Sequence, residues 1–203
     1  MPIPTDWLKK FTFNPMDKSS LRKAYLEKRR NLSPEEFTSL SGKIAQHLLS
    51  FLQNYSCVHL FLPIAKFAEF DTFFLLNQSS LSHIKWICSK VDGSDLQHYT
   101  IDASTQLKED KWGIPSPVNA NPADIFEVEV VLCPLLSYDI QGNRLGYGKG
   151  YYDKFLSELK QPFISCGISF FPPQTELLQA EAHDIPLNMV VNPEGILKFG
   201  TNE

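Results

Sequence analysis

The sequence lacks any apolar run near the roughly 18 residues that a membrane-spanning helix needs. Its first residues, MPIPTDWLKKFTFNP, also lack the charged start, apolar stretch and small-residue cleavage site of a secretory signal. We therefore expect a protein that neither inserts into a membrane nor is exported, and a cytoplasmic location.

Cysteine is scarce, and its spacing excludes the usual cysteine sites. Cys57, Cys88, Cys133 and Cys166 lie far apart, and none belongs to a C-x-x-C pair. Each lies in or beside an apolar run typical of a strand, where cysteine behaves as a small buried hydrophobe. The sequence thus predicts neither a disulfide nor a zinc site, in keeping with a reducing compartment.

An excess of positive charge is absent too, because 19 Lys and Arg stand against 23 Asp and Glu. Domains that bind nucleic acid are usually basic, so we expect no nucleic-acid partner. The basic residues are concentrated between Lys18 and Arg30, where Glu27 is the only acid. On a helix, Arg22 and Arg29 lie within about 40° of Lys18. This stripe predicts a small anion as ligand, with a solvated face as the alternative.

The hydrophobic fraction of 43%, with 12% aromatic residues, is ample for a packed core. Two helices are predicted near the N-terminus, over residues 18–31 and 34–53. The second begins with a capping box, in which Ser33 is the N-cap, Pro34 the first helical residue and Glu36 the third.

Short apolar runs separated by helical stretches occupy the rest of the chain. Several runs are apolar at consecutive positions, which suits strands covered on both faces. Strand–helix alternation predicts a three-layer α/β/α domain with a mainly parallel sheet. We expect one domain over residues 17–203, preceded by an N-terminal arm over residues 1–16. The expected strands are 58–62, 84–88, 97–101, 128–134, 163–168 and 187–191, and the expected helices are 71–79, 149–160 and 174–182.

A glycine-rich loop joins the strand at 128–134 to the helix near 149–160. Ligands of open α/β sheets bind beyond the carboxyl ends of strands, where glycine lets backbone N–H groups approach closely. The helix start adds free N–H donors, and Arg144 and Lys149 add cations suited to phosphate. The loop therefore predicts a phosphate site. Its glycines are Gly142, Gly146, Gly148 and Gly150.

The spacing of this loop fits neither common phosphate-binding template. A P-loop needs Ser or Thr after the Gly-Lys pair, but Gly150 follows Gly148 and Lys149 here. A dinucleotide fingerprint needs G-x-G-x-x-G, whereas residues 146–150 give G-x-G-x-G. A surface turn is the alternative. Asp153 also has two roles open to it, a favourable carboxylate in the first helical turn or a Mg²⁺ ligand beside phosphates.

The loop sequence GNRLGYGKGYYD closely resembles the signature of the 5-formyltetrahydrofolate cyclo-ligase family. The resemblance extends over about residues 17–195, although Ser116 and Asn188 depart from the common pattern. The shorter matching segments, in the same order as in the family, are KSSLR at 18–22, LSPEE at 32–36, EFDT at 69–72, WGIPSP at 112–117 and HDIPLN at 183–188.

This resemblance implies the fold of sugar-phosphate isomerases and CoA transferases, the NagB/RpiA/CoA-transferase-like fold. It implies an enzyme that uses ATP and Mg²⁺ to convert 5-formyltetrahydrofolate, free or polyglutamylated, to 5,10-methenyltetrahydrofolate. ADP and phosphate are released, through a phosphorylated formyl (imidate) intermediate. We expect a monomer.

The resemblance also implies roles for individual residues on the nucleotide side. Lys18 and Arg22 match ligands of the ATP phosphates, and Asp153 and Asp184 match magnesium carboxylates. ATP would then lie between the glycine-rich loop, the edge of the first helix and Asp184. The implied ATP-binding residues of the loop are Arg144, Leu145, Gly146, Tyr147, Gly148, Lys149, Gly150, Tyr151 and Tyr152, of which Arg144, Lys149 and Tyr151 take part in catalysis.

On the folate side, Glu69 matches the acid that accepts N–H bonds from the pterin, and Pro63 lies near it. Trp112 either stacks on the folate or is a core residue. Folate would enter from the side of Glu69. The loop residues that also border the folate are Tyr147, Gly148, Lys149, Gly150 and Tyr151.

Two other functions remain open. A non-catalytic nucleotide- or folate-binding module on the same fold would keep the loop without turnover. A sugar-phosphate isomerase or CoA-transferase-like enzyme is suggested only by analogy of fold. It would need no ATP, and the sequence offers no separate catalytic base for it.

Overall fold

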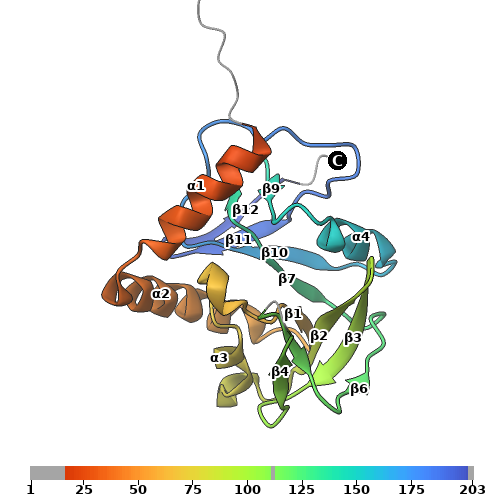
Figure 1. Ribbon diagram of the computed structural model, residues 1–203. Helices are drawn as coiled ribbons and strands as arrows, with labels where there is room; N and C mark the ends of the chain where they lie inside the picture. Colours follow the sequence, from red (N-terminus) through yellow and green to blue (C-terminus); the bar gives the residue numbers. More distant parts are fainter. Residues whose placement is uncertain (1–16, 111–112, 201–203) are drawn as a thin grey trace, which may run out of the picture.

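Strands that are apolar at consecutive positions form the centre of an eight-stranded sheet (Figure 1). The computed structural model describes residues 17–110 and 113–200. The five central strands run parallel in the order β11, β10, β7, β1 and β2, which confirms the predicted mainly parallel sheet. Their bounds are Met189–Asn192, Ile164–Ile168, Val130–Pro134, Cys57–Leu60 and Lys85–Asp92, respectively.

Antiparallel strands form both edges of the sheet, a feature that the sequence pattern does not indicate. On one side β3 (Asp95–Ile101) pairs with β2, and β6 (Asn121–Pro122) pairs with β3. On the other side β12 (Gly195–Lys198) pairs with β11. Two separate two-stranded sheets are formed by β4 (Leu107–Glu109) with β5 (Pro115–Pro117) and by β8 (Ser137–Tyr138) with β9 (Arg144–Leu145).

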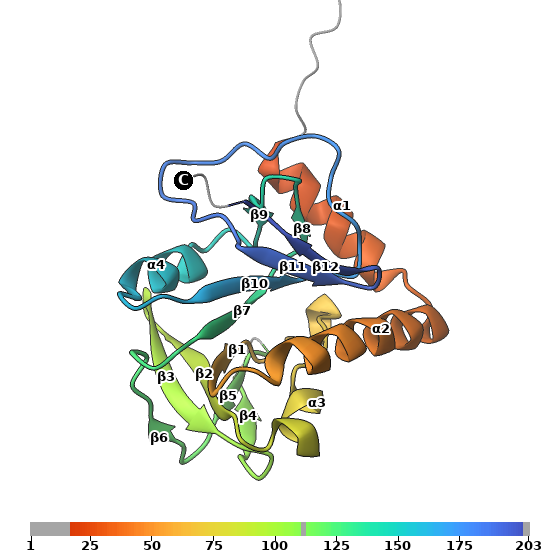
Figure 2. The same cartoon turned by 180° about the vertical axis from the view of Figure 1, so that it is seen from behind.

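Helices cover both faces of the sheet and give the predicted three layers (Figures 1 and 2). On one face lie α2 (Pro34–Leu52) and the short α3 (Phe73–Leu76), and on the other lies α4 (Tyr151–Glu158). The first helix, α1 (Lys18–Arg30), lies beside the glycine-rich loop. Two 3-10 turns, η2 (Ala65–Phe67) and η3 (Ser79–Leu81), flank α3 between β1 and β2.

Alternate residues of the central strands enter opposite hydrophobic clusters. In β1, Val58 and Leu60 join the cluster beneath α2, while Cys57 joins the cluster beneath α4. Successive side chains of a strand point to opposite faces, so a strand covered on both sides needs apolar residues at consecutive positions. The runs that predicted these strands follow from this geometry.

The capping box predicted for the second helix is present. The hydroxyl of Ser33 accepts from the backbone N–H of Glu36 at 3.1 Å, and the Glu36 carboxylate accepts from the N–H of Ser33 at 2.8 Å. These bonds satisfy two donors that the helix start would otherwise leave unpaired.

The helix expected over residues 174–182 is wrong, and the one expected over 71–79 shortens to α3. The N–H of Gln174 donates to the carbonyl of Tyr138 at 2.7 Å, and the N–H of Leu178 donates to the Asp139 carboxylate at 2.8 Å. These backbone donors therefore serve the β8–β9 hairpin, not carbonyls one helical turn earlier.

All four cysteines are free and buried, as predicted. Burial raises the pKa of Cys57 to about 11 and that of Cys88 to about 12, so both thiols stay protonated at neutral pH. Among the described residues, no helix is both long and apolar enough to cross a membrane.

Two histidines share one serine between β1, β2 and β3. The buried His59 ring contacts the Ser89 hydroxyl at 2.6 Å, and that hydroxyl contacts the His98 ring at 3.1 Å. Phe155 of α4 packs 4.5 Å from both rings. Burial lowers the pKa of His98 to about 4 and that of His59 well below its ordinary value.

This pair predicts a loss of stability in acid. Both pKa values are lower in the folded than in the unfolded chain, so the stabilisation is complete above about pH 6.5 and is lost as pH falls toward 4. We expect the melting temperature to fall between pH 7.5 and 4.5, and to fall less in His98→Gln, which removes one titrating ring. Equal losses in both proteins would exclude His98 as a cause.

Candidate active site

The order in which strands are added to the sheet reverses between β1 and β7. From β1 the chain crosses to β2 on one side, while β7 pairs with β1 on the other. In open α/β sheets, ligands bind in the crevice beyond the carboxyl ends of two such strands. The segment after β1 contains Pro63, half-buried, and Glu69, 8% exposed. A cavity of about 10 Å³ at this place is lined by Arg29, Phe61, Glu69, Phe70, Pro134, Leu135, Ile168 and Phe170.

A chain of three polar side chains lies in this crevice. The Tyr147 hydroxyl donates to Glu69 Oε1 at 2.5 Å and accepts from Arg29 Nη1 at 3.1 Å. The second carboxylate oxygen of Glu69 accepts from the N–H of Ile64 at 2.7 Å. The Tyr147 ring stacks on Phe67, with ring centres 4.6 Å apart. Tyr147, a residue of the glycine-rich loop, thus reaches the segment after β1, far away in the sequence.

Burial raises the pKa of Glu69, while hydrogen bonds from Tyr147 and Ile64 and the charge of Arg29 act in the opposite direction. Burial and the neighbouring carboxylate also raise the pKa of Tyr147, so this phenol keeps its proton. A buried acid with opposing influences on its ionisation is typical of a binding or catalytic site.

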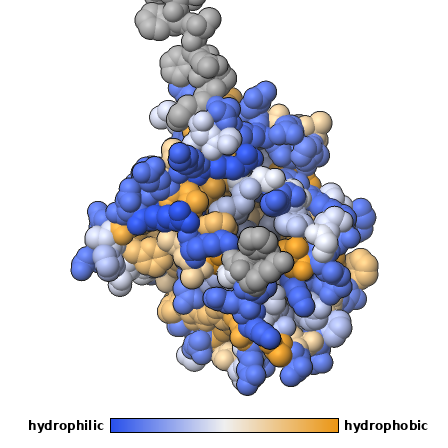
Figure 3. Space-filling view, in the orientation of Figure 1, coloured by the Kyte–Doolittle hydropathy of each residue, from blue (hydrophilic) through white to orange (hydrophobic). Residues whose placement is uncertain are grey.

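The edge of α1 contacts the glycine-rich loop. Arg22 Nε donates to the carbonyl of Gly146 at 3.0 Å. A Cβ on Gly148 would lie 3.0 Å from Arg22 Cζ, and Gly148 has φ +83°, so glycine is needed there. A Cβ on Gly146 would meet open space. In the space-filling view, the surface over α1 is largely hydrophilic (Figure 3).

Lys18 at the start of α1 is paired with two acids of the 181–184 segment. Its Nζ lies 2.8 Å from Glu181 Oε1 and 3.1 Å from Asp184 Oδ2. Burial lowers the pKa of Lys18, but these two partners outweigh it and leave the pKa raised. Burial raises the pKa of Asp184, but its hydrogen bonds and Lys18 outweigh that effect and leave it lowered. Both groups are therefore charged at neutral pH.

Arg144 and Asp153 are paired with each other. Arg144 Nη2 donates to Asp153 Oδ1 at 2.6 Å, and its side chain is only 6% exposed. The same carboxylate oxygen accepts from the N–H of Ile185 at 3.1 Å, while Arg144 Nη1 donates to the carbonyl of Ile185. These bonds tie β9, the first turn of α4 and the 183–188 segment into one unit.

The remaining loop residues differ in exposure. Lys149 is exposed, and no residue in the described part of the chain pairs with it. The Tyr151 hydroxyl donates to the carbonyl of Gly93 at 3.1 Å. Leu145 is buried in β9, and Tyr152 packs against both hydrophobic clusters. Lys149 is therefore the loop cation most available to a ligand. Trp112 lies outside the described residues.

Asp139 fixes the start of the loop by hydrogen bonds, although the sequence did not single it out as a site residue. It is fully buried, and its carboxylate accepts from the N–H groups of Gln141 and Asn143 at 2.9 and 3.0 Å. The side chain of Asn143 also donates to it at 2.8 Å. An Asp before Gly and Asn in a turn, as in D-I-Q-G-N, is the signal that predicts this role. Arg29, which the sequence places on the cationic stripe of the first helix, is buried.

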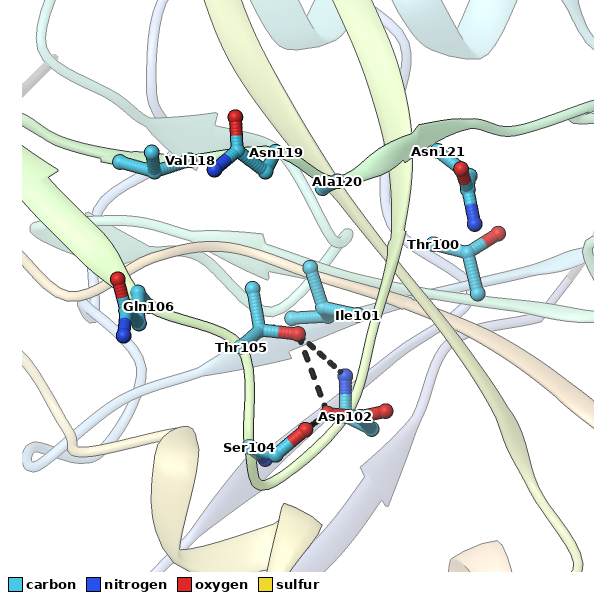
Figure 4. A pocket seen from close by; sticks show the side chains of 10 residues that line it. All are labelled: Thr100, Ile101, Asp102, Ser104, Thr105, Gln106, Val118, Asn119, Ala120 and Asn121. Carbon is cyan, nitrogen blue, oxygen red and sulfur yellow. Dashed lines mark hydrogen bonds between the residues drawn. The ribbon is translucent and has the colours of Figure 1, made fainter.

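A larger cavity, of about 420 Å³, lies between β3 and the segment that leads to β6 (Figure 4). Its wall is mostly amide and hydroxyl groups, and the Thr105 hydroxyl contacts the backbone N–H and carboxylate of Asp102. None of the sequence-predicted site residues lines it. Cavity volume therefore does not locate the site that the motifs assemble.

The residues present fit Mg²⁺ only as part of a nucleotide complex. No group of three or more His, Cys, Asp or Glu side chains in the described parts of the chain could hold a metal ion alone. Mg²⁺ is usually bound by one or two carboxylates together with substrate phosphates and water. Asp153 and Asp184 are two carboxylates that such a complex could use, and the N–H of Ile185, the residue after Asp184, donates to Asp153.

Comparisons with known proteins agree with these motifs. A model of the 5-formyltetrahydrofolate cyclo-ligase family matches residues 14–193. A Mycoplasma pneumoniae protein named 5-formyltetrahydrofolate cyclo-ligase is 33% identical over 182 residues, 88% of this chain and 100% of that protein. A Haemophilus influenzae protein of the same name is 27% identical, over 86% of this chain and 96% of its own.

Two solved structures share the fold. That of an Aquifex aeolicus 5,10-methenyltetrahydrofolate synthetase superposes with a TM-score of 0.77 at 31% identity, covering 92% of this chain and 94% of the other. That of a Mycoplasma pneumoniae 5,10-methenyltetrahydrofolate synthetase gives 0.71 at 28% identity, covering 88% and 100%.

Proposed function

The chain belongs to the 5-formyltetrahydrofolate cyclo-ligase family, and on that basis we propose how its residues carry out the ATP-dependent cyclisation of 5-formyltetrahydrofolate to 5,10-methenyltetrahydrofolate. One observation carries the proposal. Motifs more than 100 residues apart meet along α1, through Arg22 on Gly146 of the glycine-rich loop and Lys18 on Asp184.

On the nucleotide side, Lys149, Lys18 and Arg22 bind the ATP phosphates, together with the backbone N–H groups at the start of α4. Phosphoryl transfer depends mainly on positioning and on neutralising charge, which these donors supply. Arg144 and Asp153 join the loop to the start of α4 and to the 183–188 segment, and so position the same site. The proposed ATP-binding set is completed by Leu145, Gly146, Tyr147, Gly148, Gly150, Tyr151 and Tyr152.

The reaction proceeds in two steps. The formyl oxygen attacks the γ-phosphorus, the bond to the β–γ bridging oxygen breaks, and ADP leaves. N10 then attacks the activated formyl carbon and loses its proton, and phosphate departs with the former formyl oxygen as the ring closes. Phosphorylation is needed because an amide-like oxygen is a very poor leaving group. Lys149, Arg144 and Tyr151 are the residues proposed to act on the transferred phosphate.

On the folate side, the Glu69 carboxylate accepts N–H bonds from the pterin. Each of its oxygens accepts one protein hydrogen bond and retains a second lone pair. Pro63 and Tyr147 border the same crevice, and Trp112 is proposed as a further wall. The substrate is 5-formyltetrahydrofolate, in free or polyglutamylated form, and the enzyme is proposed to act as a monomer.

Asp153 and Asp184 would hold Mg²⁺ when it is bound with the nucleotide. The ion would supply positive charge beside the phosphates. Each carboxylate is now paired with a cation, Asp153 with Arg144 and Asp184 with Lys18. Binding of the magnesium–nucleotide complex gives both the cations and the carboxylates new partners at once, so Mg²⁺ and ATP should each bind better in the presence of the other.

Glu181 offers a test of this exchange of partners. It is 56% exposed and holds Lys18, but it is not among the proposed ligands. In Glu181→Gln, Lys18 loses one competing anion, so we expect ATP to bind about two- to fivefold more tightly. Isothermal titration calorimetry with a non-hydrolysable ATP analogue measures this. Glu194→Gln, a change at an exposed acid between β11 and β12, is the matched control, and unchanged or weaker binding in Glu181→Gln would contradict the exchange.

The function itself is tested by incubating the protein with 5-formyltetrahydrofolate and ATP–Mg²⁺ and following the near-ultraviolet absorbance of the methenyl product. Absorbance that rises only with ATP supports the cyclo-ligase. Ligand binding without turnover would indicate a binding module instead. Turnover without ATP would indicate an isomerase- or transferase-like enzyme.

A further inference from the structure

Arg29 of α1 is buried, 3% exposed, and connects three parts of the site. Its Nη1 donates to the Tyr147 hydroxyl at 3.1 Å and to the carbonyl of Phe67 at 3.4 Å. Its Nη2 donates to the carbonyl of Leu135 just after β7. The side chain thereby joins α1 to the glycine-rich loop, to η2 and to the end of a central strand.

No carboxylate in the described residues forms a direct ion pair with Arg29. The nearest compensation for its charge runs through the Tyr147 hydroxyl to Glu69. A buried cation without compensation is costly, so the three side chains depend on one another.

The hydrogen-bonding capacity of each group fixes the direction of this chain. A guanidinium can only donate, so the Tyr147 hydroxyl accepts from Arg29, and its single proton points to Glu69. The other oxygen of Glu69 already accepts from the N–H of Ile64. Both carboxylate oxygens therefore receive hydrogen bonds, which is the arrangement that an ionised acid prefers.

We propose that Arg29 is a positioning residue for Glu69, acting through Tyr147 to hold the carboxylate ionised and correctly oriented for the N–H groups of the substrate. This rests on the folate-binding role of Glu69 in the proposed function.

The titratable and charged groups facing Glu69 come from three elements. Arg29 comes from α1, Tyr147 from the loop and Tyr152 from α4. Burial raises the pKa of Tyr152 far above its ordinary value, so it stays neutral. Of the three, Arg29 is the cation, and its loss should raise the pKa of Glu69 further.

The neighbouring Arg30 provides a matched control. It lies on the same helix, but it is exposed, and within the described part of the chain its guanidinium donates only to the carbonyl of Lys66, at 2.9 and 2.6 Å. Arg30→Gln therefore removes the same charge from the same helix without touching the chain to Glu69.

The test measures the titration of Glu69 by carbon NMR of protein labelled at the glutamate carboxyl, with Glu69→Gln assigning the signal. We expect Arg29→Gln to move the Glu69 midpoint upward, and Tyr147→Phe, which removes the hydrogen bond to Glu69 itself, to move it in the same direction by at least as much. Arg29→Lys should restore part of the wild-type value, and Arg30→Gln should change nothing. An unchanged midpoint in folded Arg29→Gln, or an equal shift in Arg30→Gln, would overturn the proposal.

Calorimetry with 5-formyltetrahydrofolate, without ATP, gives the second readout. At pH 7, affinity should fall about tenfold in Arg29→Gln and recover as pH rises, while affinity for ATP stays within about twofold. A loss that does not depend on pH would indicate a purely structural role and contradict the proposal. If the wild-type protein forms no methenyl product, the proposed function fails, but the NMR titration still reports on Arg29.

Discussion

Replacing Lys149 with alanine should lower kcat/KM for ATP by about 100-fold or more, with little change in the melting temperature. The side chain is exposed and has no partner in the described part of the protein, so its removal takes nothing from the fold. Its charge stands beside the start of α4, where free backbone N–H groups already favour an anion. Loss of a cation there reduces stabilisation of the transferred phosphate.

Initial rates at varied ATP and saturating 5-formyltetrahydrofolate measure this effect. Lys154→Ala is the matched control, because Lys154 is also an exposed lysine of the same region but is paired with Asp95. The control should keep wild-type kinetics. ATP kinetics in Lys149→Ala equal to those of the wild type would remove Lys149 from the phosphate site.

Replacing Glu69 with glutamine should raise KM for 5-formyltetrahydrofolate by about 100-fold while KM for ATP changes by less than about threefold. The amide has nearly the same shape but no charge, and its N–H₂ end must face either the Ile64 N–H or the Tyr147 hydroxyl proton. One donor is then left unpaired in a buried place. The group that accepts substrate N–H bonds is lost as well.

Asp71→Asn controls for the loss of a nearby carboxylate. Asp71 is exposed, and its side chain accepts from the N–H of Phe73 at the start of α3, away from the crevice. Its replacement should leave both KM values near wild type. Equal effects on the two substrates in Glu69→Gln would show that the change disturbs the whole site and would argue against a specific folate contact.

The cationic stripe shows what the spacing of residues on a helix can and cannot predict. It predicts that Lys18, Arg22 and Arg29 share one side of a helix. In the structure Arg22 and Arg29 contact the glycine-rich loop, whereas Lys18 contacts the 181–184 segment. It does not separate their roles, because periodicity gives the face of a helix and not the depth of each residue. Arg22 contacts the loop at its rim, whereas Arg29 is buried at the crevice.

The ion pairs between these charged residues could not be predicted from the sequence for a similar reason. Arg144 and Asp153 were expected to face phosphate and metal separately, yet Arg144 donates directly to Asp153, and each also bonds to the backbone of Ile185. Lys18 meets Glu181, which is 163 positions away in the chain. Such pairs depend on which segments the fold brings together, and composition and spacing carry no information about that.

The sequence by itself determined much of the local structure, and it predicted a phosphate site in the glycine-rich loop. The capping box follows from the unpaired N–H groups at a helix start, and the apolar strands follow from the alternation of side chains between two covered faces. Gly148 follows from a backbone conformation with positive φ. Each of these depends mainly on residues that are close together in the sequence. The tertiary structure alone decided the order of the strands, the antiparallel edges and the loss of the helix expected over 174–182. It also placed the loop against α1 and gave Tyr147 its contacts with Glu69 and Arg29, since those contacts arise only when distant segments pack together.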